Sequence, residues 1–142
     1  MFDTNAYDKA CENIALIKRS KRKCEFYITG IQIKEVASIP DSKKEKRESL
    51  LLSIVDLRPR IVPTPFTFDY ISFSHFSFNS CPEYYRILKE SKVNRNDALI
   101  AATAIYEDCT LVTDDKELIK KMNQMRKDVV TFGEFMQRFV IV

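Results

Sequence analysis

The chain has 142 residues, of which 45% are hydrophobic and 30% charged, and its formal net charge is +3. These values predict one globular domain, residues 1–142, and the mild charge does not by itself require a polyanionic partner. Two glycines exclude a glycine-rich phosphate loop, and a single histidine with no Cys-x-x-Cys pair argues against a zinc site. No signal peptide or membrane-spanning run is present, so we expect a cytoplasmic protein with reduced thiols and no membrane partner.

Helical spacing of apolar residues alternates with short apolar runs along the chain. The predicted helices are residues 5–19, 30–39, 42–55, 82–91, 97–107, 116–125 and 131–139. The predicted strands are residues 1–2, 26–28, 61–62, 110–113 and 129–130. Capping boxes are predicted where a Ser or Thr is followed three residues later by Gln or Glu, at Thr29–Gln32, Ser42–Glu45 and Thr131–Glu134. Pro40 stops the helix that carries Glu35.

Residues 66–80 interleave phenylalanines with serines, and partial alternation indicates extended structure without a firm assignment. Three interpretations stay open for this stretch: core packing, a homodimer surface, or a stacking platform for unpaired bases. We interpret His75, which lies inside it, as a structural residue.

The alternation of short apolar strands with helices predicts an α/β fold. We expect a three-layer α/β/α sandwich with a central, mainly parallel sheet of four to five short strands. Functional sites in such sheets form at the carboxyl ends of the strands. The acids that can reach one such end are Asp3, Glu35, Asp97 and Asp115.

These acids have two interpretations. Helix N-caps are often Asp, which would explain Asp97 and either Asp114 or Asp115 without any site. Alternatively, carboxylates that converge on one pocket repel each other, and some become protonated unless a cation neutralises them. Because the ligands would be oxygen only, the cation would be Mg²⁺ or Mn²⁺.

Four motifs together give the chain a family resemblance. They are Asp3-Thr4-Asn5 after the first strand, Glu35 in an early helix behind Thr29, Asp97 before Ile100-Ala-Ala-Thr-Ala104, and Thr113-Asp114-Asp115 after the next strand. The last two are highly specific together. On these motifs the chain resembles PIN domains over nearly its whole length. The resemblance implies a metal-dependent ribonuclease, and many small PIN domains are VapC-type toxins of toxin–antitoxin pairs.

The resemblance also implies roles for individual residues. Those expected to be catalytic and to bind Mg²⁺ (or Mn²⁺) are Asp3, Glu35, Asp97 and Asp115. Those expected beside them, orienting a carboxylate or water or capping a helix, are Asn5, Thr113 and Asp114. The chain departs from the family pattern in its short first strand and in the long aromatic stretch before the central helix.

The expected partners are an RNA substrate, an antitoxin protein and a second copy of the chain. Two basic runs, residues 18–23 and 43–47, are either RNA-contacting surfaces or ordinary solvated helix faces. Two other functions compete with the ribonuclease. One is a non-catalytic PIN domain that binds RNA or protein. The other is a phosphoacceptor receiver-like domain, which predicts a Lys after the last strand, where Val129-Val130-Thr131 has none.

Overall fold

The structure is a computed structural model that describes residues 1–20, 24–66, 76–80 and 82–140. Its α-helices are α1 (Thr4–Glu12), α2 (Ile14–Ser20), α3 (Gly30–Ala37), α4 (Lys44–Leu57), α5 (Pro82–Leu88), α6 (Arg95–Tyr106), α7 (Lys116–Gln124) and α8 (Phe132–Phe135). A 3₁₀ turn, η1 (Asp41–Lys43), precedes α4, and a π-helical segment, η2 (Met136–Val140), follows α8. The strands are β1 (Tyr27–Thr29), β2 (Arg60–Val62), β3 (Thr64–Phe66), β4 (Phe76–Ser80), β5 (Leu111–Val112) and β6 (Val129–Val130).

Local side-chain bonds explain where several helices begin and end. The capping boxes at Thr29–Gln32 and Thr131–Glu134 are confirmed. The box predicted at Ser42 is wrong, because Pro40 begins a 3₁₀ turn that places Ser42 inside it, and α4 then starts without a side-chain cap. The predicted helix 5–19 is interrupted at Asn13, whose side-chain amide donates to the Lys9 carbonyl at 2.9 Å.

The strands form parallel pairs instead of the continuous sheet that the sequence predicted. Within the described residues these pairs are β1 with β2, β3 with β4, and β5 with β6. The predicted first strand is reduced to one parallel bridge between Phe2 and Val112. A three-layer sandwich around a sheet of four to five strands is therefore not confirmed, whereas the helices and parallel strand pairs agree with the predicted α/β class.

The side chain of Gln32 explains part of this interruption. Its oxygen accepts from the Thr29 backbone N–H at 2.9 Å, and its amide nitrogen donates to the Phe2 carbonyl at 2.5 Å. These backbone groups of the first strand and of β1 therefore bond to a side chain instead of to another strand. The hydrogen bonds of Gln32 therefore take the place of backbone hydrogen bonds between the N-terminal segment and β1.

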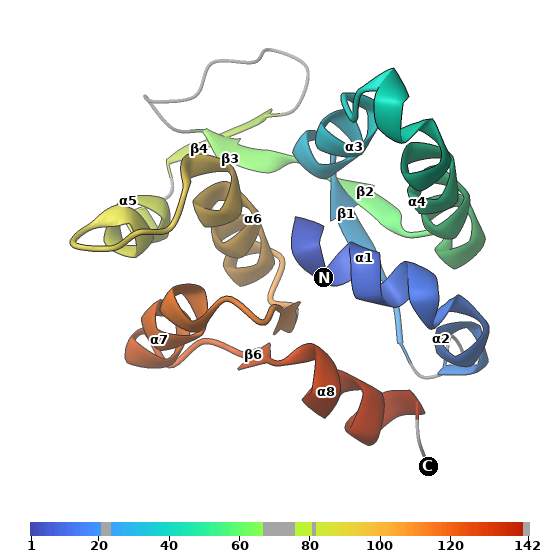
Figure 1. Cartoon of the computed structure of the whole chain (residues 1–142). Coiled ribbons are helices and arrows are strands. Elements are labelled where there is room, and N and C mark those ends of the chain that lie inside the picture. Colours follow the sequence, from blue (N-terminus) through green and yellow to red (C-terminus); the bar gives the residue numbers. More distant parts are fainter. Residues whose placement is uncertain (21–23, 67–75, 81, 141–142) are drawn as a thin grey trace.

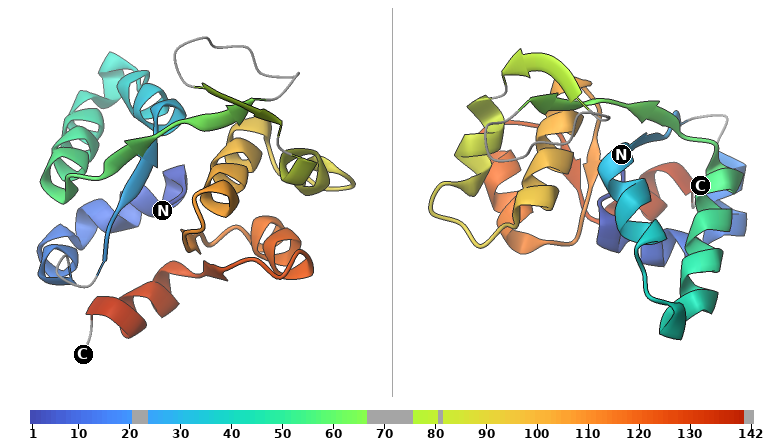
Figure 2. Two further views of the ribbon diagram at one scale, coloured as in Figure 1. Left: turned by 180° about the vertical axis from the view of Figure 1, so that it is seen from behind. Right: turned by 90° about the horizontal axis from the view of Figure 1, so that it is seen from above.

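The N-terminus and α1 lie in the middle of the molecule, with α6 on one side and α3 and α4 on the other (Figure 1). The view from behind shows the same arrangement (Figure 2). One buried cluster surrounds α6, which contributes Leu99 and Ile100, and a second surrounds Phe2 and Tyr7. Within the described residues, no helix combines the length and apolar character that crossing a membrane requires.

Two sequence interpretations concern residues that lie partly outside the described ranges, and one conflicts with the structure. The ends of the Phe-Ser stretch form β3 and β4, while residues 67–75, with His75, lie outside the described residues. Residues 21–23 of the first basic run also lie outside them. Ile61, predicted to be in a buried strand, is 66% exposed in β2, whereas its neighbour Val62 is buried.

Candidate active site

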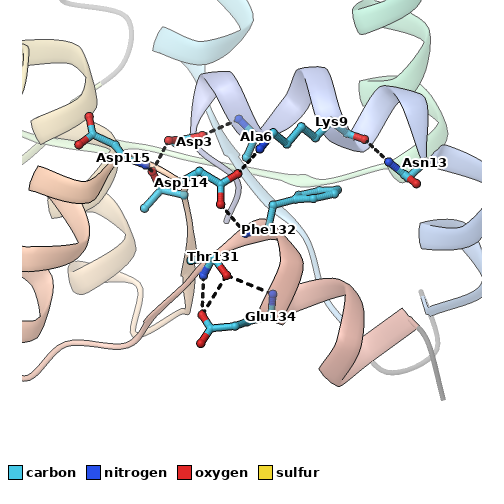
Figure 3. Close-up of polar contacts among 10 residues, drawn as sticks. Asp3, Ala6, Lys9, Asn13, Asp114, Asp115, Thr131, Phe132 and Glu134 are labelled. Atoms are coloured by element: carbon cyan, nitrogen blue, oxygen red, sulfur yellow. Dashed lines mark hydrogen bonds and ion pairs between the residues drawn. The ribbon is translucent and has the colours of Figure 1, made fainter.

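Asp3 is buried between the first bridge and α1, and only 2% of its surface is exposed. It is the N-cap of α1: one carboxylate oxygen accepts from the Ala6 N–H at 2.6 Å (Figure 3). The other oxygen accepts from the Thr113 hydroxyl, at the end of β5. Burial raises the pKa of Asp3, and the negative charges of Asp114 and Asp115 add to this effect, while the two hydrogen bonds oppose it.

Glu35 lies in the last turn of α3 and accepts hydrogen bonds from two other helices. The Thr4 hydroxyl, at the start of α1, donates to one carboxylate oxygen at 2.6 Å. The Asn96 amide, in the first turn of α6, donates to the other oxygen at 2.6 Å. The starts of α1 and α6 thus fix the orientation of Glu35, which sequence spacing alone placed only on a helix.

Asp97 lies in the first turn of α6 but is not its cap. Asn94 is the N-cap, and its side-chain oxygen accepts from the Asp97 N–H at 2.8 Å. The Asn94 amide nitrogen also donates to an Asp97 carboxylate oxygen at 2.6 Å. The interpretation of Asp97 as the N-cap of this helix is therefore wrong.

The two acids after β5 have different roles. Asp115 is the N-cap of α7 and accepts from the N–H groups of Glu117 and Leu118 at 2.8 and 3.1 Å. Asp114, for which the family resemblance implied either a helix cap or no role, instead accepts from Lys9 at 2.6 Å and from the Phe132 N–H at 3.0 Å (Figure 3). These bonds connect α1 to α8, and the same two donors lower the pKa of Asp114.

The electrostatics at Asp97 connect the four predicted acids. The pKa of Asp97 is raised to about 6, mainly by burial and additionally by the negative charges of Asp3, Glu35 and Asp115. A pKa near 6 means that Asp97 is partly protonated in weak acid, because its neighbours disfavour another negative charge. Asp3, Glu35 and Asp115 therefore each lie within electrostatic reach of Asp97.

The acids are not gathered into a finished coordination shell. In the part of the chain that the structure describes, no three Asp, Glu, His or Cys side chains are arranged to bind one metal ion together. Each carboxylate is instead held by hydrogen-bond donors of its own. Within these same residues, Asp97 and Asp115 each keep one carboxylate oxygen that accepts no hydrogen bond.

The family comparison agrees with this arrangement of acids. The family model of the PIN domain matches residues 3–123 of the chain. The chain belongs to the PIN domain family. No curated protein and no solved structure matches it. PIN domains are generally nucleases that typically use divalent metals, so membership supports a nuclease, a hydrolase that acts on nucleic acid.

The donor set of this PIN domain suits a hard divalent cation. Its acidic groups offer oxygen atoms only, and the mutual repulsion at Asp97 is the kind that a bound cation relieves. The residues that would hold such an ion are Asp3, Glu35, Asp97 and Asp115. Thr113 contacts Asp3 directly, whereas Asn5 is exposed and lines a hollow with Lys9 and Asp115.

The sequence motifs gave no role to three side chains at this site: Thr4, Asn94 and Asn96. Each donates a hydrogen bond to one of the predicted acids. The signal for Asn94 was present, because an Asn three residues before Asp97 is in the position of an N-cap followed by a first-turn acid. No sequence signal connects Asn96 with Glu35, since the contact depends on how α3 and α6 are arranged.

Proposed function

We propose that this PIN domain is a metal-dependent endoribonuclease that hydrolyses phosphodiester bonds of RNA. Asp3, Glu35, Asp97 and Asp115 would bind Mg²⁺ or Mn²⁺. The observation that carries the proposal is the position of the partly buried Asp97 near Asp3, Glu35 and Asp115; burial and these charges raise its pKa to about 6. Acids that destabilise one another in this way are expected where a cation is to be bound.

The chain's own residues would prepare the site for the reaction. A divalent cation, when bound, supplies Lewis-acid activation of water and neutralises charge on the phosphate. Thr4 and Asn96 hold Glu35 in one orientation, and Thr113 does the same for Asp3. Donors of this kind keep carboxylates directed, and their removal typically changes metal affinity or activity 10- to 100-fold.

The physiological role that we propose is that of a VapC-type toxin. In this role the enzyme would cleave cellular RNA in the cytoplasm, form a homodimer and be neutralised by an antitoxin protein. The support is the family, which often occurs in toxin–antitoxin pairs. Co-expression with a neighbouring gene product should restore growth if overproduction of the chain stops it.

The test of the enzymatic proposal is RNA cleavage by the wild-type chain and by Asp97→Asn, across titrations of Mg²⁺ and Mn²⁺. We expect cleavage that depends on the added metal and is lost in Asp97→Asn, while circular dichroism shows the same fold. Metal-independent cleavage, or equal cleavage by both chains, would contradict the proposal.

One observation favours a second candidate, a non-catalytic PIN domain that binds RNA or protein. The acids are anchored by separate donors and, in the described residues, do not form a three-ligand cluster. This candidate predicts RNA binding without cleavage at every metal concentration. The same titration therefore distinguishes the two functions.

A further inference from the structure

Among the described residues, the most exposed large apolar side chains come from one short segment. Val55 is 69% exposed, and Leu52 and Ile61 are each 66% exposed. Leu52 and Val55 lie on α4, and Ile61 follows in β2. Single exposed apolar residues are normal on a protein surface, whereas a group of them commonly marks an interaction site. The concentration in this segment is therefore typical of a contact surface.

Leu52 and Val55 lie on the side of α4 that faces away from the core. The opposite side is buried and contributes Leu50, Ile54 and Leu57 to the cluster around Phe2. Because residues three apart on a helix are neighbours, Leu52 and Val55 form one exposed surface. The helix lies at the edge of the molecule, away from α6 and α7 (Figure 1), and the view from behind agrees (Figure 2). A partner can therefore reach this surface without displacing another element.

Most charges along α4 are paired within the chain. Between Lys44 and Arg58, the ion pairs are Lys44–Glu48, Lys46–Asp8, Arg47–Asp41 and Asp56–Lys18.

Two charged residues of this range form no ion pair within the described part of the chain. They are Glu45, in the first turn of α4, and Arg58, its C-cap, and both are exposed. Glu45 precedes Leu52 by about two helical turns and therefore lies on the same side of the helix. One negative and one positive charge thus flank the apolar pair at opposite ends. We call Glu45, Leu52, Val55 and Arg58 the outer face of α4.

We propose that the outer face of α4 binds the same face of a second copy of the chain, with the two helices antiparallel. In a twofold dimer one surface contacts itself. An antiparallel arrangement brings Leu52 and Val55 of both copies together at the centre and directs Glu45 of each copy toward Arg58 of the other. A parallel arrangement would bring like charges together. The inference rests on the homodimer of the proposed function and names its interface.

The composition of this face disfavours other occupants. RNA is bound by surfaces rich in positive charge, whereas the unpaired charges here are one of each sign. Helices that bind membrane surfaces typically carry Lys and Arg beside their apolar side, whereas Glu45 is acidic. A different protein would need charges complementary to Glu45 and Arg58, and a second copy already supplies them. Because α4 alone forms a small interface, we expect a dimer that dissociates on dilution.

Sedimentation velocity of the full chain over a concentration series measures the dissociation constant of this dimer. Leu52→Asn and Val55→Asn are compared with Tyr106→Asn, the control, which changes an exposed side chain at the end of α6. Glu45→Arg and Arg58→Glu are measured singly and then combined in one chain. Circular dichroism confirms the fold of each variant.

We expect the wild-type chain to dimerise. Leu52→Asn and Val55→Asn should each raise the dissociation constant at least about tenfold, since one substitution removes an apolar contact from both copies. Each charge reversal should weaken the dimer, and the combination should restore it, because exchanging the two charges recreates both pairs. Tyr106→Asn should leave the dissociation constant unchanged.

A wild-type chain that stays monomeric at every concentration would overturn the inference and leave the face to a different protein. Equal effects of Leu52→Asn and Tyr106→Asn would also overturn it. Combined charge reversals that fail to restore the dimer would contradict the antiparallel arrangement.

The outcome is separate from the proposed catalysis. If the chain dimerises through α4 but never cleaves RNA, the interface stands and the enzymatic proposal fails. If the chain cleaves RNA while remaining monomeric, the interface alone is wrong.

Discussion

Asp97 is the residue whose pKa responds to all three of the other predicted acids. Its carboxylate is partly buried, faces the charges of three other acids, and receives one hydrogen bond from Asn94. Burial and like charges both disfavour its ionised form, and the single bond offsets them only in part. Ionised Asp97 therefore destabilises the metal-free protein, and a bound cation would offset the repulsion.

This condition predicts a pH dependence of stability. Between pH 3.8, the ordinary pKa of Asp, and about 6, the folded chain binds more protons at Asp97 than the unfolded chain does. The contribution of Asp97 to the free energy of unfolding of the metal-free protein should therefore fall as pH rises through this window. Asp97→Asn should remove that fall and be more stable than wild type at neutral pH, by about 1 kcal/mol.

Urea unfolding in the presence of a chelator, repeated at several pH values, measures this effect. Asp108→Asn is the matched control, because Asp108 is exposed and lies just after the opposite end of α6. A difference in stability between Asp97→Asn and wild type that does not change with pH, or an equal gain from Asp108→Asn, would contradict the explanation.

At the scale of elements, the site depends on helix starts. The N-termini of α1, α6 and α7 carry Asp3 and Thr4, Asn94 to Asp97, and Asp115, respectively. Helix N-termini favour negative charge because their backbone N–H groups point outward. The helix starts thus bring Asp3, Asp97 and Asp115 toward one place.

The neighbouring residues Asn94 and Asn96 both contact a predicted acid, but they should differ in their contribution to stability. Asn94→Ala removes the N-cap of α6 and should lower the free energy of unfolding by about 1 kcal/mol. Asn96→Ala leaves the cap in place but removes a donor from Glu35. It should raise the metal concentration needed for half-maximal RNA cleavage by about tenfold, with little change in stability.

Urea unfolding and metal titrations of cleavage, made on both variants, test this division. The prediction is wrong if Asn96→Ala unfolds as readily as Asn94→Ala while needing no additional metal.

Sequence reasoning predicted elements better than the contacts between them. Thr29 and Thr131 begin helices as their capping boxes indicated, since both partners of a box lie within one turn. The capping box predicted at Ser42 does not form, because the 3₁₀ turn that Pro40 begins already includes Ser42. The acids were located by motif, but their donors Thr4 and Asn96 come from elements that are distant in sequence from Glu35. Periodicity and capping carry no information about such contacts.

At the scale of the whole molecule, Gln32 connects the N-terminal segment at Phe2 with β1. Within the described residues, these two segments do not pair as strands. The Gln32 side chain completes the cap of α3 and also bonds to the Phe2 carbonyl, next to Asp3. Sequence alternation predicted one sheet because it reports which segments are extended, not which backbone groups are already bonded to side chains. The position of Asp3 relative to Glu35 therefore depends on a buried side-chain contact.

Gln32→Leu should consequently cost more than the loss of an ordinary helix cap. It leaves the Thr29 N–H and the Phe2 carbonyl without their present partner inside the protein, and we expect a loss of about 3 kcal/mol. Glu134→Leu is the matched control, because it removes the equivalent residue of the exposed capping box of α8 and should cost about 1 kcal/mol or less. Urea unfolding that gives equal losses for the two variants would show that the contact with Phe2 contributes nothing.

The central claim, that Asp3, Glu35, Asp97 and Asp115 form one divalent-cation site, is tested most directly by calorimetric titration of the metal-free chain with Mn²⁺. We predict saturable Mn²⁺ binding by the wild-type chain and by Asp108→Asn, and loss of that binding in Asp97→Asn. Mn²⁺ binding that is unchanged in Asp97→Asn would contradict the claim.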